Sequence, residues 1–160
     1  MTTIEPAPFT LPSRYVLDLR ALAQHAQQDA QEALPRIADE VTHRLPVNVH
    51  RLELLARNQH VAAFAESVLA GLESCETGPA NPPLRVAEGV ASGYRIQHLD
   101  TRRTVDDLAN RALLAAVERV LDSIRATQAE DEQQYDNDAE TDRRVVEHEQ
   151  YLADLDAGRL

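Results

Sequence analysis

The feature that most constrains the fold is a long, mostly apolar segment at residues 105–129. Five of its polar side chains recur at steps of four, seven, four and three residues, which places them on one narrow side of a helix. They are Asp107, Arg111, Glu118, Asp122 and Arg125. A helix with so little polar surface should be buried against more than one neighbour. The sequence therefore predicts a mainly α fold, a bundle of about four to five helices.

An alanine-rich helix is predicted near the start of the chain. Ser13 can cap it by accepting a backbone N–H bond. Its apolar stripe consists of Val16, Leu19, Ala23, Ala26, Ala30 and Ala33. Because these side chains are small, another helix can approach closely, and we predict that the stripe joins two copies of the chain as a homodimer. Pro35 should either end this helix or begin a new short one that Pro46 ends.

Further start and stop signals follow along the chain. Asn48 is a suitable cap for a helix over residues 49–72, which ends before a segment rich in glycine and proline. Polar and apolar residues alternate at the end of the segment 84–98, so it is predicted as a small β-hairpin, with a loop as the alternative. Thr104 should cap the central helix, with Asp107 as the reciprocal capping partner.

These signals divide the chain into three regions. Residues 1–12 should be an extended lead-in because they contain three prolines, residues 13–129 a helical domain, and residues 130–160 an acidic tail. The tail should start with a flexible linker or an exposed helical extension. Thr141 should then cap a short amphipathic helix. Its stripe consists of Val145, His148, Leu152 and Leu155.

Composition bounds the class of protein. A chain of 160 residues can bury a core without disulfides, and the single Cys75 indicates a reducing compartment. The first residues lack the basic and then apolar pattern of a secretory signal. No run reaches the ~20 apolar residues that a spanning helix needs. We therefore expect a cytoplasmic protein that does not enter a membrane.

The basic side chains exclude several classes of enzyme. All sixteen of them are arginine, and the chain contains no lysine. A Walker-type phosphate loop, a Schiff-base enzyme and a protein kinase each need a lysine amine. The motifs G-x-G-x-x-G, G-x-S-x-G and H-E-x-x-H are absent as well. The sequence predicts no enzymatic activity and no cofactor.

Negative charge is concentrated at the end of the chain. The net charge of the protein is −11, and residues 130–160 hold eleven acidic residues against three arginines. Such a surface repels nucleic-acid phosphates and anionic membranes, but it can attract a basic protein surface. We predict that partner binding uses six carboxylates and two leucines of this region. They are Glu130, Asp131, Glu132, Asp136, Asp138, Glu140, Leu152 and Leu155.

The resulting hypothesis is a non-enzymatic protein-binding module that covers or blocks a basic partner, such as a nucleic-acid-handling protein. It is similar, in class alone, to small inhibitors of phage-defence systems and to DNA-mimicking proteins. One alternative is a dimeric assembly factor, chaperone or antitoxin that holds a client through its C-terminal helix. Another is a metal-dependent helical-bundle enzyme. Glu40 and His43 form one E-x-x-H pair, but such sites need two pairs and two more inward glutamates.

Overall fold

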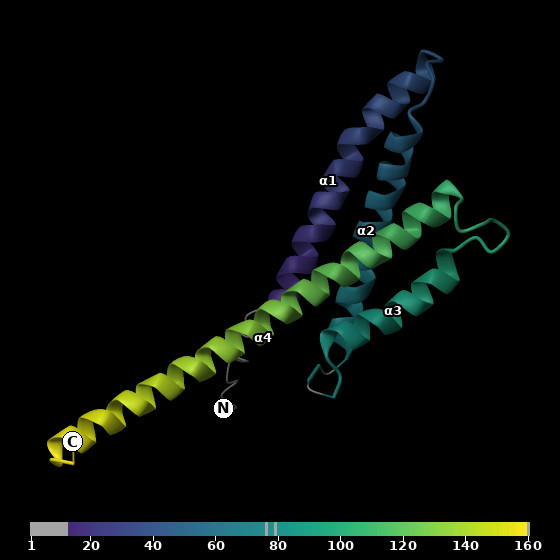
Figure 1. The fold of residues 1–160 in the computed structure, drawn as a ribbon. Coiled ribbons are helices and arrows are strands. Elements are labelled where there is room, and N and C mark those ends of the chain that lie inside the picture. The colour runs from purple at the N-terminus through teal and green to yellow at the C-terminus, as the bar shows by residue number, and fades with distance from the viewer. Residues whose placement is uncertain (1–12, 76, 79, 160) are drawn as a thin grey trace, which may run out of the picture. The chain divides into compact units, whose positions relative to one another are not determined.

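A computed structural model describes residues 13–75, 77–78 and 80–159. All the secondary-structure elements named in these residues are α-helices, which confirms the predicted mainly α bundle (Figure 1). The four helices are α1 (Arg14–Thr42), α2 (Val49–Ser74), α3 (Pro83–His98) and α4 (Leu108–Asp156). None of these helices is both long enough and apolar enough to cross a bilayer. The lead-in predicted for residues 1–12 lies outside the described residues.

The chain divides into two units, Met1–Ile124 and Arg125–Leu160. Helix α4 contributes residues to both units. The first unit holds the hydrophobic core, to which all four helices contribute. Its fully buried centre includes Leu19 of α1, Phe64 of α2, Ala87 of α3 and Val117 of α4. The prediction that the central helix is buried against more than one neighbour is therefore confirmed.

Helix α1 is longer than the sequence predicted. It begins after Ser13, whose Oγ accepts a bond from Val16 N, so this cap is confirmed. The prediction that Pro35 ends a helix or begins a new one is wrong, because α1 continues through it. Beyond Pro35, α1 remains in contact with α2, where Glu40 pairs with Arg51.

The predicted end of α1 is wrong as well. The helix ends at Thr42, before Pro46. His43 N bonds to the carbonyl of Asp39, and Arg44 has a φ of 52°, in the left-handed region. Leu45 N then bonds to the carbonyl of Glu40, so the chain reverses within a few residues. Figure 1 shows α1 and α2 as the antiparallel pair that this turn produces.

Helix α2 begins as predicted. Asn48 Oδ1 accepts bonds from the backbone N–H groups of His50 and Arg51 at 3.0 and 3.3 Å. Further along, Gly71 allows a close approach to α3. A Cβ added at Gly71 would lie 3.0 Å from Val90 Cγ2 and 3.4 Å from Val86 Cγ1. Because glycine has no side chain, the two helices can pack closely at this point.

Residues 84–98 form neither a hairpin nor a loop, and both predictions for this segment are wrong. They belong to α3, which begins at Pro83, a residue suited to the first turn of a helix. Val86, Ala87, Ala91 and Tyr94 are buried along one side of it. Their spacing is helical, whereas the alternation at the end of the segment is too short to define a strand.

Gly89 of α3 is a site at which a substitution should stabilise the protein. A Cβ at Gly89 would meet no atom within 4 Å, and Gly89 lies inside the helix. Replacing it with alanine should raise the free energy of unfolding by about 0.5–1 kcal/mol, because glycine is a poor helix former. Chemical denaturation measures this change. Gly71→Ala is the matched comparison and should gain less, since its methyl group meets Val90. Equal gains at both positions would contradict the close packing of α2 and α3.

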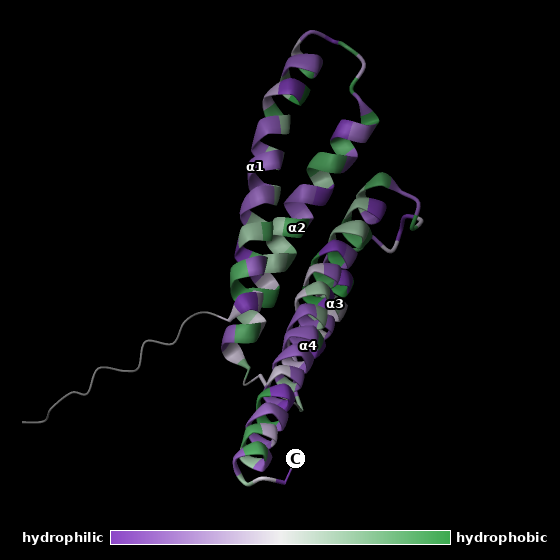
Figure 2. Ribbon diagram, turned by 60° about the vertical axis from the view of Figure 1, so that its left-hand side comes forward, coloured by the Kyte–Doolittle hydropathy of each residue, from purple (hydrophilic) through white to green (hydrophobic). Residues whose placement is uncertain are grey.

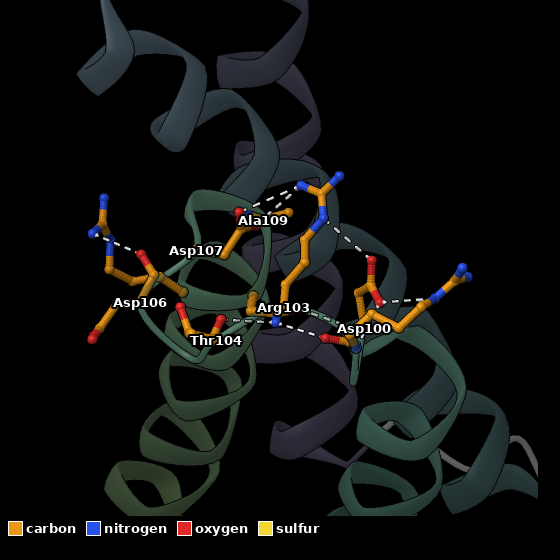
Figure 3. A network of polar contacts seen from close by, with 9 residues as sticks. Asp100, Arg103, Thr104, Asp106, Asp107 and Ala109 are labelled. Carbon is orange, nitrogen blue, oxygen red and sulfur yellow. Dashed lines mark hydrogen bonds and ion pairs between the residues drawn. The ribbon is translucent and has the colours of Figure 1, made fainter.

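Helix α4 begins later than predicted. Thr104 is not its cap, and Val105 lies outside the helix. Asp107 caps it instead, since Oδ1 accepts a bond from Ala109 N at 3.1 Å and the carbonyl accepts from Arg111 N at 2.8 Å. The preceding loop is held by a polar network (Figure 3). In it, Arg103 pairs with the carboxylates of both Asp100 and Asp107.

The buried side chain of Asn110, which is only 2% exposed, forms hydrogen bonds to the same loop. Its Nδ2 donates to the carbonyls of Asp100 and Thr104 at 3.0 and 3.1 Å. Its Oδ1 accepts from Asp100 N at 3.0 Å. One buried amide therefore satisfies three backbone groups of the α3–α4 connection, because its carbonyl and NH₂ groups match them in kind.

Candidate partner-binding site

The predicted site lies in the second unit, where residues 130–156 continue helix α4. The prediction that Thr141 caps a separate helix is wrong, because α4 is uninterrupted and Thr141 Oγ1 donates to the carbonyl of Asn137 at 2.9 Å. Of the two alternatives for the start of the tail, the helical extension is correct. The first unit ends at Ile124, close to the predicted domain boundary between residues 129 and 130. The division of the chain into three domains stays a prediction.

The six predicted carboxylates are all exposed, but they do not form one stripe. Glu130, Asp131 and Glu132 are consecutive, so about 100° separates each from the next around the helix axis. Asp136, Asp138 and Glu140 extend the distribution to the remaining sides. The structure thus places negative charge around the whole circumference of this part of α4.

The apolar residues at the end of α4 behave differently. Val145, His148, Leu152 and Leu155 follow at steps of three, four and three, which places them on one side of the helix. Leu152 and Leu155 are 49% and 51% exposed. Figure 2 shows hydrophobic residues recurring near the C-terminal end of α4. We call these four residues the C-terminal stripe. Tyr151, also exposed, lies next to it and was not predicted.

Local polar contacts support this exposed helix. Gln128 Nε2 donates to Glu132 at 3.0 Å, and Gln134 Nε2 donates to Asp138 at 3.4 Å. Arg144 pairs with Glu140. Each contact joins residues four apart and contributes roughly 0.2–0.5 kcal/mol to an isolated helix. Since the described side chains from residue 130 to 150 are all exposed, local contacts rather than burial stabilise this segment.

The Glu40–His43 pair does not converge on a common point. Glu40 pairs with Arg51, and its second carboxylate oxygen accepts from Asn48 N at 3.3 Å. His43 Nδ1 lies 2.9 Å from the carbonyl of Asp39 and 3.0 Å from its carboxylate. Among the residues that the structure describes, no three His, Cys, Asp or Glu side chains are grouped so that they could hold a metal ion.

A polar cluster between α2 and α3 was missed by the sequence reasoning. His60 Nδ1 lies 2.9 Å from the phenol oxygen of Tyr94, and the Tyr94 ring centroid is 4.3 Å from that of His98. Burial and, to a smaller extent, the nearby His98 lower the pKa of His60. Burial raises the pKa of Tyr94. His60 and Tyr94 are 34 residues apart, so only the packing of α2 on α3 brings them together.

This cluster leads to a prediction for the pH dependence of stability. The unfolded chain binds a proton at His60 near its ordinary pKa of about 6.5, whereas the folded protein binds it only at lower pH. Unfolding is therefore accompanied by proton uptake below that pH, and the contribution of His60 to stability is lost as the pH falls. Denaturation of wild type and His60→Gln between neutral pH and pH 5 measures this effect. The difference in the free energy of unfolding between wild type and His60→Gln should become smaller toward low pH. If this difference does not change with pH, the pKa of His60 is not lowered in the folded protein.

Comparison of the chain with protein-family models, with curated proteins and with solved structures finds no match.

Proposed function

We propose that this protein is a non-enzymatic binding module, and that the second unit binds a basic protein partner. The partner presents an apolar groove flanked by arginine or lysine side chains, and the C-terminal stripe lies in that groove. The observation that carries the proposal is that Leu152 and Leu155 are each about half exposed on one side of a strongly acidic helix. Covering or blocking a nucleic-acid-handling protein is one role that fits this chemistry.

Charge supports a basic partner over a neutral or acidic one. Residues 130–160 carry a net charge of −8, and carboxylates surround the helix. Opposite charge on a partner attracts such a helix, whereas like charge or a phosphate backbone repels it. The attraction between exposed charges is screened by salt, so binding should weaken as ionic strength increases.

The stripe supports a helix-in-groove mode of binding. Its steps of three and four residues are those by which an amphipathic helix anchors its apolar side in a partner's groove. Leucine side chains in such grooves supply the burial, and the surrounding charges select the partner. Acidic charge alone would give no fixed register, because the carboxylates occupy all sides of the helix.

The test uses two synthetic amphipathic helices as probes. Both have leucines on one side, flanked by arginines in the basic probe and by glutamates in the acidic probe. Fluorescence anisotropy measures their binding to the full-length protein at low and high salt. We expect binding of the basic probe only. Leu152→Ser with Leu155→Ser should weaken it roughly tenfold or more, because buried anchors dominate such interfaces.

A control variant makes this experiment specific. Val146 is 60% exposed but lies about 100° around the helix from Val145, outside the C-terminal stripe. Val146→Ser should therefore leave probe binding unchanged. If it weakens binding as much as the leucine variants do, or if both probes bind equally, the proposal is wrong.

The alternative, a protein that holds a client, uses the same helix, but it binds through the apolar stripe and does not depend on the carboxylates. Changing the six carboxylates to amides should weaken binding and flatten its salt dependence if charge selects the partner. A chaperone or antitoxin that depends on the apolar stripe alone would retain its binding in this amide variant.

A further inference from the structure

The first unit has a pocket where α1, α2 and α4 meet. Its volume is about 700 Å³, within the range of roughly 300–1,000 Å³ that is usual for small-molecule sites. The lining residues come from all three helices. They are Leu22 of α1, Arg57 of α2, and Ala115, Glu118, Arg119, Asp122 and Ser123 of α4. All of them belong to the first unit, so the pocket contains no residue of the C-terminal stripe.

The apolar sides of this pocket are Leu22 and Ala115. Leu22 packs against the core beside the alanine-rich stripe of α1, of which Leu19, Ala23 and Ala26 belong to the core itself. The stripe is therefore not exposed for the predicted contact between two copies, and the homodimer stays a prediction. Ala115 has only a methyl group, so it leaves room in the pocket that a larger side chain would fill.

Arg57 is the lining residue that lacks a partner. It lies four and seven positions before the buried Val61 and Phe64, on the side of α2 that faces the core. Its Nε is buried and has no hydrogen-bond partner among the residues that the structure describes. Glu53, one turn earlier on α2, accepts bonds from Arg111 instead, at 2.7 and 2.8 Å. Since buried polar groups are rarely left unmatched, an acceptor in the pocket is what Arg57 requires.

The other charges of the lining define the acceptor further. Arg119 adds a second guanidinium group to the pocket, and an anion that contacts both groups would offset the repulsion between them. Glu118, which pairs with Arg95 at 3.2 Å, and Asp122 add two negative charges. The formal charge of the lining is therefore zero. A ligand with a single negative charge fits these surroundings, whereas a ligand with several would be repelled by the two carboxylates.

We propose that this pocket binds a small carboxylic acid with an apolar body. The carboxylate accepts hydrogen bonds from Arg57 and Arg119, because guanidinium groups match the planar pair of oxygens of a carboxylate. The apolar body lies against Leu22 and Ala115. This site goes beyond the proposed function, which uses residues of the second unit.

Titration of the full-length protein with benzoate, followed by the amide signals in nuclear magnetic resonance spectra, tests the proposal. Benzamide has nearly the same shape but no charge, and inorganic phosphate has more charge and no apolar body. We expect saturable binding of benzoate, with signal changes at residues 115–123. Benzamide and phosphate should each bind roughly tenfold more weakly or less, because one lacks the charge-assisted bonds and the other the apolar contacts.

Four variants identify the residues that bind. Arg57→Gln and Arg119→Gln should each weaken benzoate binding roughly tenfold or more, because each removes a charged donor. Ala115→Leu fills part of the pocket and should weaken binding as well. It should remain folded, since position 115 is exposed and leucine is a good helix former. Arg20→Gln is the matched control, because Arg20 is an exposed arginine of α1 that does not line the pocket.

Circular dichroism verifies that each variant is folded, and Arg119 is exposed, so at least its variant should keep the fold. Leu152→Ser with Leu155→Ser should leave benzoate binding unchanged, which separates this site from the proposed function. If benzoate does not bind, or if benzamide binds equally well, the proposal is overturned. Unchanged binding in both Arg57→Gln and Arg119→Gln, or an equal loss in Arg20→Gln, would overturn it as well.

Discussion

Phe64→Ala should lower the free energy of unfolding of the first unit by about 3–5 kcal/mol. The Phe64 ring is fully buried in the core cluster to which α1, α2, α3 and α4 all contribute. Its centroid lies 5.2 Å from that of Tyr94, so the ring also contributes to the packing of α2 against α3. Alanine would remove this contact and leave a cavity that four packed helices cannot close completely.

Chemical denaturation monitored by circular dichroism measures this loss. Phe64→Leu keeps most of the side-chain volume and should cost much less than alanine. Leu17→Ala removes an exposed leucine and should change stability within about 0.5 kcal/mol. A Phe64→Ala protein as stable as Leu17→Ala would show that the core is not centred on this ring.

The second large effect is expected at Asn110. Replacing it with alanine removes three hydrogen bonds to the α3–α4 connection and leaves backbone groups of Asp100 and Thr104 without their partner. Each buried group that loses its partner costs about 1–3 kcal/mol. Because water can enter near a loop, we expect a total loss of about 2–4 kcal/mol in the free energy of unfolding, within the range for broken buried networks.

The isosteric variant Asn110→Asp separates shape from hydrogen bonding. It retains an acceptor for Asp100 N, but it places a buried carboxylate against the two carbonyl oxygens that Nδ2 now serves. It should therefore also be destabilised at neutral pH, and it should recover part of its stability at low pH, where a protonated carboxyl group can donate again. If Asn110→Asp were as stable as wild type, the amide would not act as the donor in this network.

Some elements could be predicted because their signals are local. Ser13 and Asn48 cap their helices through bonds to residues two or three positions away, so the sequence alone identifies them. The central helix was recognised because five of its polar residues follow a single period over about five turns. Its burial required no knowledge of its neighbours, since so narrow a polar side leaves no other arrangement.

Other elements depend on contacts that the sequence does not display. Helix α1 passes through Pro35 and packs against α2, although local propensity predicts that the helix ends there. In α3, Gly89 is a poor helix former, but a Cβ added there would meet only open space on the exposed side of the helix. The pairing of His60 with Tyr94 needs the α2–α3 contact first.

The candidate site was predicted in part. The composition of residues 130–160 identified the acidic region, and the spacing of Leu152 and Leu155 identified their common side. A helical extension was one of two alternatives for the start of this region, but the continuation of α4 past Thr141 was not predicted, because almost none of the preceding residues is apolar. Contacts between residues four apart, such as Gln134 with Asp138, carry helical structure through it.

The distribution of carboxylates around α4 has a kinetic consequence. Charge that surrounds a rod accelerates the first encounter with an oppositely charged protein from any direction, but it does not favour one final orientation. The leucines then determine how long a correctly seated complex lasts. Amide substitutions should therefore act mainly on the association rate constant, and Leu152→Ser mainly on the dissociation rate constant.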